Sequence, residues 1–183
     1  FVEPADVYFE LARFPRALQP RAQRAPRRLY AFPEAGALPV DTVMGAALLI
    51  RRAVVAQIGD LDEGYFMYGE EMDWCWRAKA AGWDVRWLPG PHITHLGGRA
   101  AARVPYAMLA HRFASTFRFI GRRQGAGAVG QARAGLALAA LQNAGLTTLR
   151  FLARRDDRAT LAHELRGSWT VLKTALTGRA RRG

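Results

Sequence analysis

The sequence predicts an α/β unit followed by a basic helical tail, and three observations support this fold class. Short apolar or alternating runs, such as residues 43–50 and the stretch WDVRWLP, are typical of strands. Between them, residues 70–81 have acids in the first turn of a helical pattern and a glycine beyond its end. Residues 101–183 then have the pattern of three helices and hold fifteen basic residues against three acidic ones.

The composition limits the class of protein. The chain has 183 residues, half of them hydrophobic, which is enough for one domain, or for one domain with an appendage. Its single cysteine, Cys75, excludes an internal disulfide and fits a reducing compartment. Because the chain begins at Phe1 without an initiator methionine, we expect a piece of a longer protein.

The net charge of +12 lies entirely in the tail, since residues 1–40 carry +2 and residues 41–100 carry −2. A basic appendage on a nearly neutral domain indicates an anionic partner, either a membrane surface or a nucleic acid. We therefore expect three regions: a Pro/Arg-rich connecting segment at 1–38, a catalytic-type unit at 39–100 and a basic helical tail at 101–183.

The elements follow from local signals. Residues 13–33 are rich in Pro and Arg and should be mostly extended. The run 43–50 predicts a buried strand, in which Gly45 and Ala46 would let a ligand come close. A short helix at 52–58 should end at Gly59. WDVRWLP and then HITH should form strands, and helices should cover 106–123, 128–153 and 157–177. The uncharged run 134–149 is shorter than the roughly 20 residues of a spanning helix, so we expect an interfacial or core helix.

The stretch GYFMYGEEMDWCWRAKAAGW is the strongest candidate site. Its adjacent carboxylates, Glu70 and Glu71, would lie at a helix start, where the helix dipole favours negative charge. Taken alone, such acids are more often solvated helix-start residues than catalytic groups. Asp73 and Arg77 are one turn apart and should form a weak surface pair.

Three segments, GAALLIRR, GDLDEGYFMYGEEMDWCWRAKAAGW and WLPGPHITHLGG, resemble in order and spacing the C-terminal half of the catalytic domain of family 2 inverting glycosyltransferases. The rhamnosyltransferase-like members are most similar, and the resemblance covers roughly residues 39–100. It implies a GT-A fold, of which this chain would hold the acceptor-side part, followed by the basic tail.

The resemblance also implies roles for single residues. Glu71 would be the general base beside Glu70, although other members have the shorter Asp at this position. His95 would lie near the metal and the donor diphosphate. We also predict substrate contacts for a set of residues around this site, although Arg99 could equally be a surface charge and Gly45 a packing glycine. The set is Gly45, Ala46, Asp62, Glu63, Tyr68, Asp73, Trp74 and Arg99.

The family holds a divalent metal, Mg²⁺ or Mn²⁺, and the donor diphosphate with an Asp-x-Asp motif in the first half of the domain. Here DLD, at residues 60–62, follows a helix and matches a later acidic loop, so we do not assign it that role. The resemblance thus implies that the nucleotide-binding half is missing and that these residues alone are inactive. The Gln-x-x-Arg-Trp motif of processive synthases is also absent, which favours addition of a single sugar.

The leading hypothesis is therefore a transferase that moves a sugar, with rhamnose as a candidate, from a nucleotide-sugar to a glycan or lipid-linked acceptor in cell-wall or polysaccharide biosynthesis. We expect it at the cytoplasmic face of the cell membrane, peripherally bound to the anionic surface through its tail. The alternative is a non-catalytic basic module that binds membranes or nucleic acid. Nucleic acid is less favoured, because no DNA-binding motif is present and the acids at 60–73 would repel phosphate.

Overall fold

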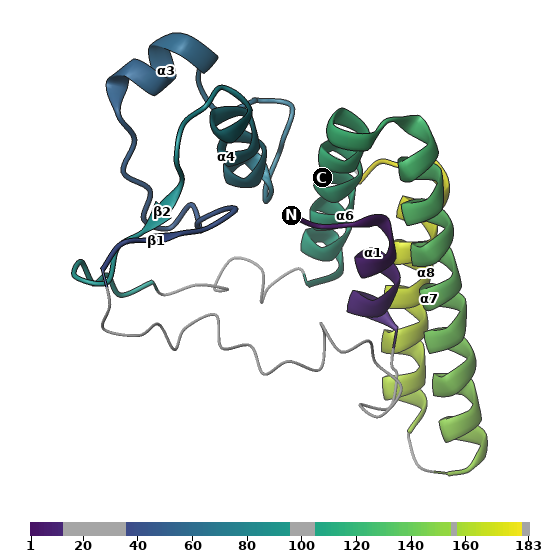
Figure 1. The fold of residues 1–183 in the computed structure, drawn as a ribbon. Coiled ribbons are helices and arrows are strands. Elements are labelled where there is room, and N and C mark those ends of the chain that lie inside the picture. Colours follow the sequence, from purple (N-terminus) through teal and green to yellow (C-terminus); the bar gives the residue numbers. More distant parts are fainter. Residues whose placement is uncertain (13–35, 96–104, 155–156, 181–183) are drawn as a thin grey trace. The chain divides into compact units, whose positions relative to one another are not determined.

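The structure is a computed structural model that describes residues 1–12, 36–95, 105–154 and 157–180 (Figure 1). The chain divides into two compact units. The first is formed by residues 20–99 together with Phe1, and the second by residues 2–19 and 100–183. The described residues are mostly helical and contain one small two-stranded sheet, so the coarse expectation of mixed α and β structure is met.

The first unit contains two short helices and the sheet. Helix α3 spans Arg52–Ile58 and helix α4 spans Glu70–Ala80. Strands β1 (Leu38–Pro39) and β2 (Arg86–Trp87) pair antiparallel, with Leu38 opposite Trp87. The core of this unit consists of Val54 from α3 with Trp74 and Ala78 from α4, against which Ile50, Val55, Ile58 and Trp83 pack.

Glycines set the ends of these helices, as the sequence predicts. Gly59 follows α3 with φ 78°, and Gly82 follows α4 with φ 87°. At the other end of α4, Gly69 precedes the first turn with φ 88°. These values lie where a residue with a Cβ is strained, so glycine allows the chain to change direction at each position.

Two predicted strands are wrong. Residues 43–50 form no strand; the Ala47 N–H instead donates to the Met44 carbonyl over 3.3 Å, which closes a turn. Leu49 is 92% exposed, so this apolar run is not buried in the described structure. HITH, residues 92–95, is exposed and forms no strand. The physical reason is shared: strands are stabilised by a neighbouring ladder, and within residues 36–95 only β1 and β2 pair.

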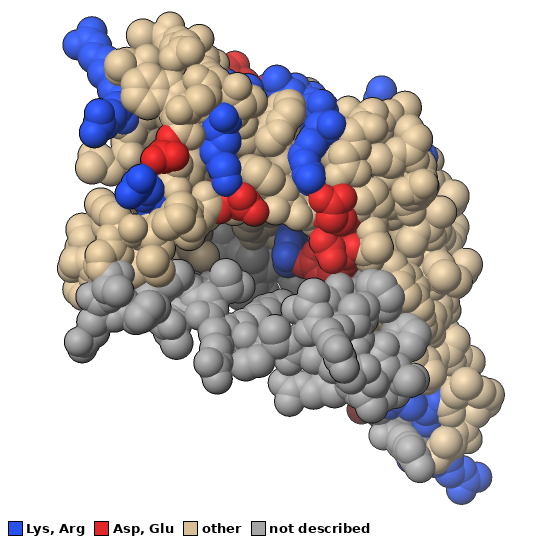
Figure 2. All heavy atoms as spheres, viewed as in Figure 1, with Lys and Arg blue, Asp and Glu red and all other residues tan. Residues whose placement is uncertain are grey.

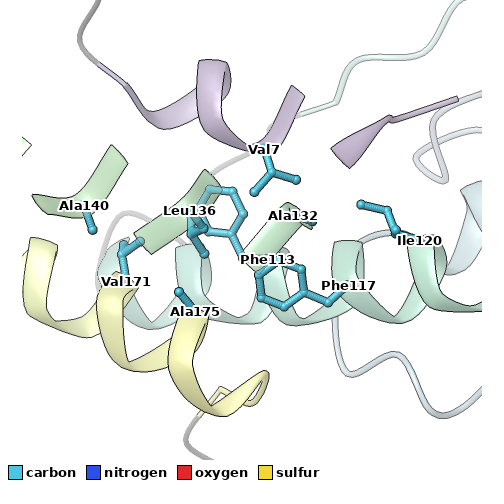
Figure 3. Packing of buried hydrophobic residues seen from close by; sticks show 9 residues of the cluster. All are labelled: Val7, Phe113, Phe117, Ile120, Ala132, Leu136, Ala140, Val171 and Ala175. Carbon is cyan, nitrogen blue, oxygen red and sulfur yellow. The ribbon is translucent and has the colours of Figure 1, made fainter. Parts of the chain in front are cut away.

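The second unit is a helical bundle built from α1 (Pro4–Leu11), α6 (Pro105–Gln124), α7 (Ala126–Leu152) and α8 (Arg158–Thr177). The three long helices match the predicted ones within three residues at each end. All four helices contribute to one core, and Figure 3 shows its side chains pointing toward one another. Its members are Val7, Phe113, Phe117, Ile120, Ala132, Leu136, Ala140, Val171 and Ala175.

Helix α1 lies inside the segment 1–38, which we expected to be a connecting segment. A reciprocal capping box between Glu3 and Asp6 begins the helix. It packs on α7, where the Tyr8 hydroxyl donates to Gln142 over 2.7 Å and the Asn143 amide donates to the Leu11 carbonyl over 2.9 Å. The predicted extended segment, residues 13–33, lies outside the described residues.

The run 134–149 forms the middle of α7. Asn143 and Thr147 are buried there, whereas Leu138, Leu141 and Leu149 are exposed, so this part of the helix has both a core face and a solvent face. Among the described helices, none is both long enough and apolar enough to cross a membrane.

Candidate active site at the start of helix α4

Helix α4 holds the acidic loop that precedes it through three hydrogen bonds to backbone carbonyls. The Trp74 indole N–H donates to the Gly59 carbonyl over 3.0 Å. The Arg77 guanidinium donates to the carbonyls of Ile58 and Asp60, over 2.6 and 2.8 Å. The end of α3 and the start of the loop are therefore fixed to the helix that carries the candidate base.

The pair of Asp73 and Arg77 is not the weak surface contact that their spacing suggests. The Asp73 side chain has no exposed surface, and its Oδ2 accepts a hydrogen bond from Arg77 Nε over 2.9 Å. Its Oδ1 accepts from the Tyr65 hydroxyl over 3.3 Å. A buried carboxylate is stabilised only when it is paired and hydrogen-bonded, and here both conditions are met. Asp73 thus holds internal contacts that fix the loop.

The two candidate catalytic carboxylates occupy the first turn of α4. Both side chains are partly exposed. Glu71 Oε2 accepts a hydrogen bond from the Gly69 backbone N–H over 3.2 Å. Glu70 Oε2 is buried, and no hydrogen-bond partner reaches it among the described residues. Both acids therefore lie beside the free backbone N–H groups of the first helical turn.

The structure brings Gly45 next to Glu71. A Cβ built on Gly45 would lie 3.7 Å from Glu71 Cβ and 3.8 Å from the carboxyl carbon. Ala46 follows in the exposed turn. The sequence interpretation that a ligand can come close at Gly45 and Ala46 stays a prediction, but these residues and the candidate base do share one location.

The loop residues differ in how strongly they are held. The Asp62 side chain accepts from the Gly64 N–H over 2.8 Å, a local turn contact, while Glu63 is exposed. Tyr68 has φ 67°, a conformation that is strained for a residue with a bulky side chain, and it is partly exposed. Observed backbone strain of this kind is found preferentially at functional sites. Tyr68 is thus a partly exposed aromatic residue two positions before Glu70.

The remaining predicted site residues differ in burial. Trp74, which the sequence analysis assigns to the substrate, is a core residue of the first unit. Cys75 is fully buried. His95 is exposed, and Arg99 lies outside the described residues.

A divalent metal is implied by the family resemblance, and the described residues by themselves do not supply a site for one. Within the described ranges no three His, Cys, Asp or Glu side chains gather as a ligand set. Exposed His95 could contribute at most one ligand, and hard divalent cations such as Mg²⁺ need several oxygen ligands. We therefore derive no catalytic step through a metal.

Two features of the site were missed by sequence reasoning. Lys79 Nζ, on α4, donates to Asp41 Oδ1 over 2.6 Å, and this contact lowers the pKa of Asp41. It ties the segment before the Gly45 turn to the helix of the candidate base. The contact joins residues 38 apart, and nothing local in the sequence indicates it. The spacing of Arg77 indicates only its contact with Asp73, whereas in the structure Arg77 also holds the loop through the carbonyls of Ile58 and Asp60.

Comparison with known proteins gives partial similarity to glycosyltransferases. Over 85 residues, 46% of this chain, it is 36% identical to the N-acetylglucosaminyl-diphospho-decaprenol L-rhamnosyltransferase of Mycobacterium tuberculosis, and this stretch is 28% of that protein. Rhamnosyltransferase WbbL of Escherichia coli is 29% identical over 85 residues, or 32% of its length. A low-salt glycan biosynthesis hexosyltransferase, Agl10 of Haloferax volcanii, is 46% identical over 41 residues, which are 22% of this chain and 13% of that protein.

No family model matches the chain, and no solved structure matches it. The matched stretches span about a third or less of the curated relatives' own length. At this coarse level, the chain contains a segment similar to one found in rhamnosyltransferases and a hexosyltransferase.

Proposed function

We propose that this chain is the acceptor-side part of an inverting, GT-A type glycosyltransferase of family 2. One observation carries the proposal: Glu71 lies at the start of α4, partly exposed and beside Gly45, in a chain similar to curated rhamnosyltransferases. The side chain has the chemistry of a general base, and the three atoms nearest to a Cβ built on Gly45 all belong to it.

The proposed reaction needs one proton acceptor. As the acceptor hydroxyl attacks the anomeric carbon of the donor sugar, its proton passes to the Glu71 carboxylate. The new carbon–oxygen bond forms while the bond to the donor diphosphate breaks, and the nucleoside diphosphate leaves with the electron pair. Attack from the face opposite the leaving group inverts the anomeric centre, so no enzyme nucleophile is required.

The contacts of α4 support this assignment. Glu71 lies at the positive end of the helix dipole, a position that suits a carboxylate acting as a base. The Gly69 N–H holds one carboxylate oxygen over 3.2 Å, which orients the group. Glu70, which is partly exposed in the same first turn, would bind the acceptor beside the base. Tyr68 would contribute an apolar face to the same sugar.

We propose that donor binding depends on residues outside these 183. The matched segment is 28% of the length of the Mycobacterium tuberculosis relative, which leaves room in such a protein for the nucleotide-binding Asp-x-Asp half and its divalent metal. In that case His95 and Arg99 would complete the diphosphate site, and the chain by itself would be inactive. When bound, the metal would neutralise charge on the departing diphosphate.

The acceptor class follows from the relatives' names. The Mycobacterium tuberculosis relative is named for an N-acetylglucosamine carried on a decaprenyl diphosphate. We propose a sugar on a polyprenyl diphosphate as the acceptor here, and rhamnose as the first donor sugar to test. Because such an acceptor resides in a membrane, we also propose that the protein works as a peripheral protein at the cytoplasmic face.

The test is transfer by the whole protein that contains this segment, with the configuration of the product measured by NMR. The donor would be an activated rhamnose and the acceptor a polyprenyl-diphosphate N-acetylglucosamine. The proposal predicts a product whose anomeric configuration is opposite to that of the donor. Retained configuration would reject the single-base mechanism. Failure to transfer any sugar from a panel of nucleotide-sugars would reject the glycosyltransferase assignment.

A further inference from the structure

Helix α8 has one face that the bundle core does not use. Leu165, Trp169 and Leu176 are spaced four and seven residues apart, so they lie on the same side of the helix. Trp169 is 55% exposed and Leu176 is 64% exposed. The residues of α8 that pack into the bundle, Gly167, Val171, Thr174 and Ala175, lie on the opposite side. A large aromatic ring and two leucines therefore face solvent together.

Basic side chains line this apolar stripe. Arg158 lies at the start of the helix on the same side, and Arg166 and Lys173 lie along one flank; all three are exposed. The Lys173 ammonium is 5.0 Å from the centre of the Trp169 ring. Neither Arg166 nor Lys173 has an acidic partner among the described residues.

Acidic residues are almost absent from this part of the unit. Helices α6, α7 and α8 together contain one acid, Glu164, against nine basic residues. Glu164 lines a cavity of about 230 Å³ with Tyr106 and Gly167, so its side chain faces the bundle. Two acids of the α1 region are already paired, Glu10 with Arg112 and Glu3 with Arg123, and Asp6 accepts from the Glu3 backbone N–H. Between Arg158 and Thr177 the exposed face of α8 thus has no acid, and the exposed Asp157 precedes the helix as its N-cap.

More basic side chains gather where α7 leads into α8. Arg150, Arg154 and Arg158 are exposed there, and Figure 2 shows Lys and Arg side chains in blue at this end of the helix pair, at the lower right. A second copy of the chain would meet this positive surface with an equal positive surface. Like charges repel, so self-association does not explain the face.

We propose that the stripe Leu165–Trp169–Leu176 of α8, with Arg158, Arg166 and Lys173 beside it, lies on the surface of an anionic bilayer. This inference rests on the proposed function and names the surface by which the protein would meet its membrane. Apolar and aromatic side chains that enter the headgroup boundary, with Lys and Arg reaching the phosphates, are the pattern of an interfacial helix. Tryptophan is enriched at this depth, because its ring is apolar and its N–H can still meet water.

The test uses the 183-residue chain and lipid vesicles. Binding is measured by co-sedimentation with phosphatidylcholine vesicles that contain phosphatidylglycerol, and with phosphatidylcholine alone. The double variant Arg166→Gln/Lys173→Gln should bind the anionic vesicles about 25-fold more weakly, at about fivefold for each basic side chain. The matched control, Arg51→Gln/Arg52→Gln, removes equal charge from the first unit and should bind within about twofold of wild type. Equal losses in both variants would overturn the proposal, because general charge would then explain binding.

Fluorescence gives a readout that only insertion changes. Vesicles with brominated acyl chains quench a tryptophan that enters the bilayer, and Trp169→Phe should lose that quenching while keeping the helical circular dichroism of wild type. Undiminished quenching in Trp169→Phe would overturn the proposal. The proposal would also be overturned if Leu138→Gln/Leu141→Gln, whose exposed leucines lie on α7, lost vesicle binding while Arg166→Gln/Lys173→Gln retained it.

Two further measurements distinguish membrane binding by α8 from nucleic-acid binding and from the proposed sugar transfer. Tighter binding to duplex DNA than to anionic vesicles at the same salt would overturn the proposal and indicate that the partner of this face is a nucleic acid. In the whole protein, the α8 variants should still transfer sugar to a water-soluble acceptor. If the wild-type protein bound vesicles but transferred no sugar, the proposed function would be rejected, and the inference that α8 binds membranes would still hold.

Discussion

Arg77 and Asp73 form a buried ion pair in α4, joined over 2.9 Å, and the same guanidinium holds the carbonyls of Ile58 and Asp60. Because the Asp73 side chain has no exposed surface, removing its partner would leave an uncompensated buried charge. We expect Arg77→Met to lower the free energy of unfolding of the first unit by about 3 kcal/mol or more.

The control is Arg86→Met, which breaks an exposed pair with Asp84 of similar length, 2.8 Å. Exposed pairs contribute little, so its effect should stay below about 1 kcal/mol. Urea unfolding followed by tryptophan fluorescence measures both variants, since Trp74, Trp76, Trp83 and Trp87 all belong to the first unit. Equal destabilisation by the two substitutions would contradict a structural role for the Asp73–Arg77 pair.

Gly167 in α8 should not tolerate a methyl group. A Cβ at this position would overlap the Tyr106 ring, whereas a Cβ on Gly145, in α7, meets no atom within 4 Å. We expect Gly167→Ala to destabilise the bundle by about 1–3 kcal/mol. Gly145→Ala should stabilise it by about 0.5–1 kcal/mol, because alanine favours the helix.

Urea unfolding followed by circular dichroism at 222 nm, a helical band, is the measurement for both glycine variants. Effects of the same sign would show that the Tyr106 contact does not determine the outcome. Restoration of stability by Tyr106→Ala in the Gly167→Ala background would support the contact directly.

Asp157 should make the stability of the second unit depend on pH. Its side chain accepts from the Thr160 N–H over 2.7 Å at the start of α8, and this backbone contact lowers the pKa of Asp157. A carboxyl whose folded-state pKa is lowered stabilises the fold above its unfolded pKa, about 3.9. That stabilisation is lost as pH falls through the lower, folded value.

The comparison is with Asp157→Asn, which retains a good capping side chain but cannot titrate. The melting temperature of wild type should fall more steeply than that of the variant between about pH 5 and pH 2. Taking the difference between the two proteins removes the contribution of other acids, such as Glu3, whose pKa is lowered by the Gln124 and Arg123 side chains. A difference that stays constant with pH would contradict the assignment.

His95 provides a test of the proposed donor site. In the whole protein, His95→Ala should weaken metal-dependent binding of the nucleotide-sugar, because the family resemblance places this position near the metal and the diphosphate. His92→Ala is the matched control, since His92 is also exposed and lies three residues earlier. Isothermal titration of the donor, with and without Mg²⁺ or Mn²⁺, measures both. Unchanged donor affinity in His95→Ala would show that His95 is a surface residue without a role in donor binding.

Local signals predicted the helices well, for clear physical reasons. Gly59 and Gly82 adopt positive φ where the sequence predicts helix ends, and the acids of Glu70 and Glu71 do fall in a first turn. These signals act over a few residues, so they can be recognised without knowledge of the tertiary structure. The three long helices were predictable for the same reason.

The errors concern burial and pairing between distant residues. The apolar run 43–50 has the composition of a buried strand, but a strand also needs a ladder partner, which composition does not reveal. The spacing of Asp73 and Arg77 predicts their contact, yet burial turns a weak surface pair into an internal one. The approach of Gly45 to Glu71 joins segments 26 residues apart, and nothing local in the sequence indicates it.

The central claim is that Glu71 accepts the proton of the acceptor hydroxyl, and turnover of Glu71→Gln in the whole protein tests it most directly. Glutamine keeps the shape of the side chain and its contact to the Gly69 N–H but cannot act as a base. We expect turnover to fall by about 10²–10⁴-fold with donor affinity unchanged, and Glu70→Gln to have a smaller effect. Wild-type turnover in Glu71→Gln would contradict the account.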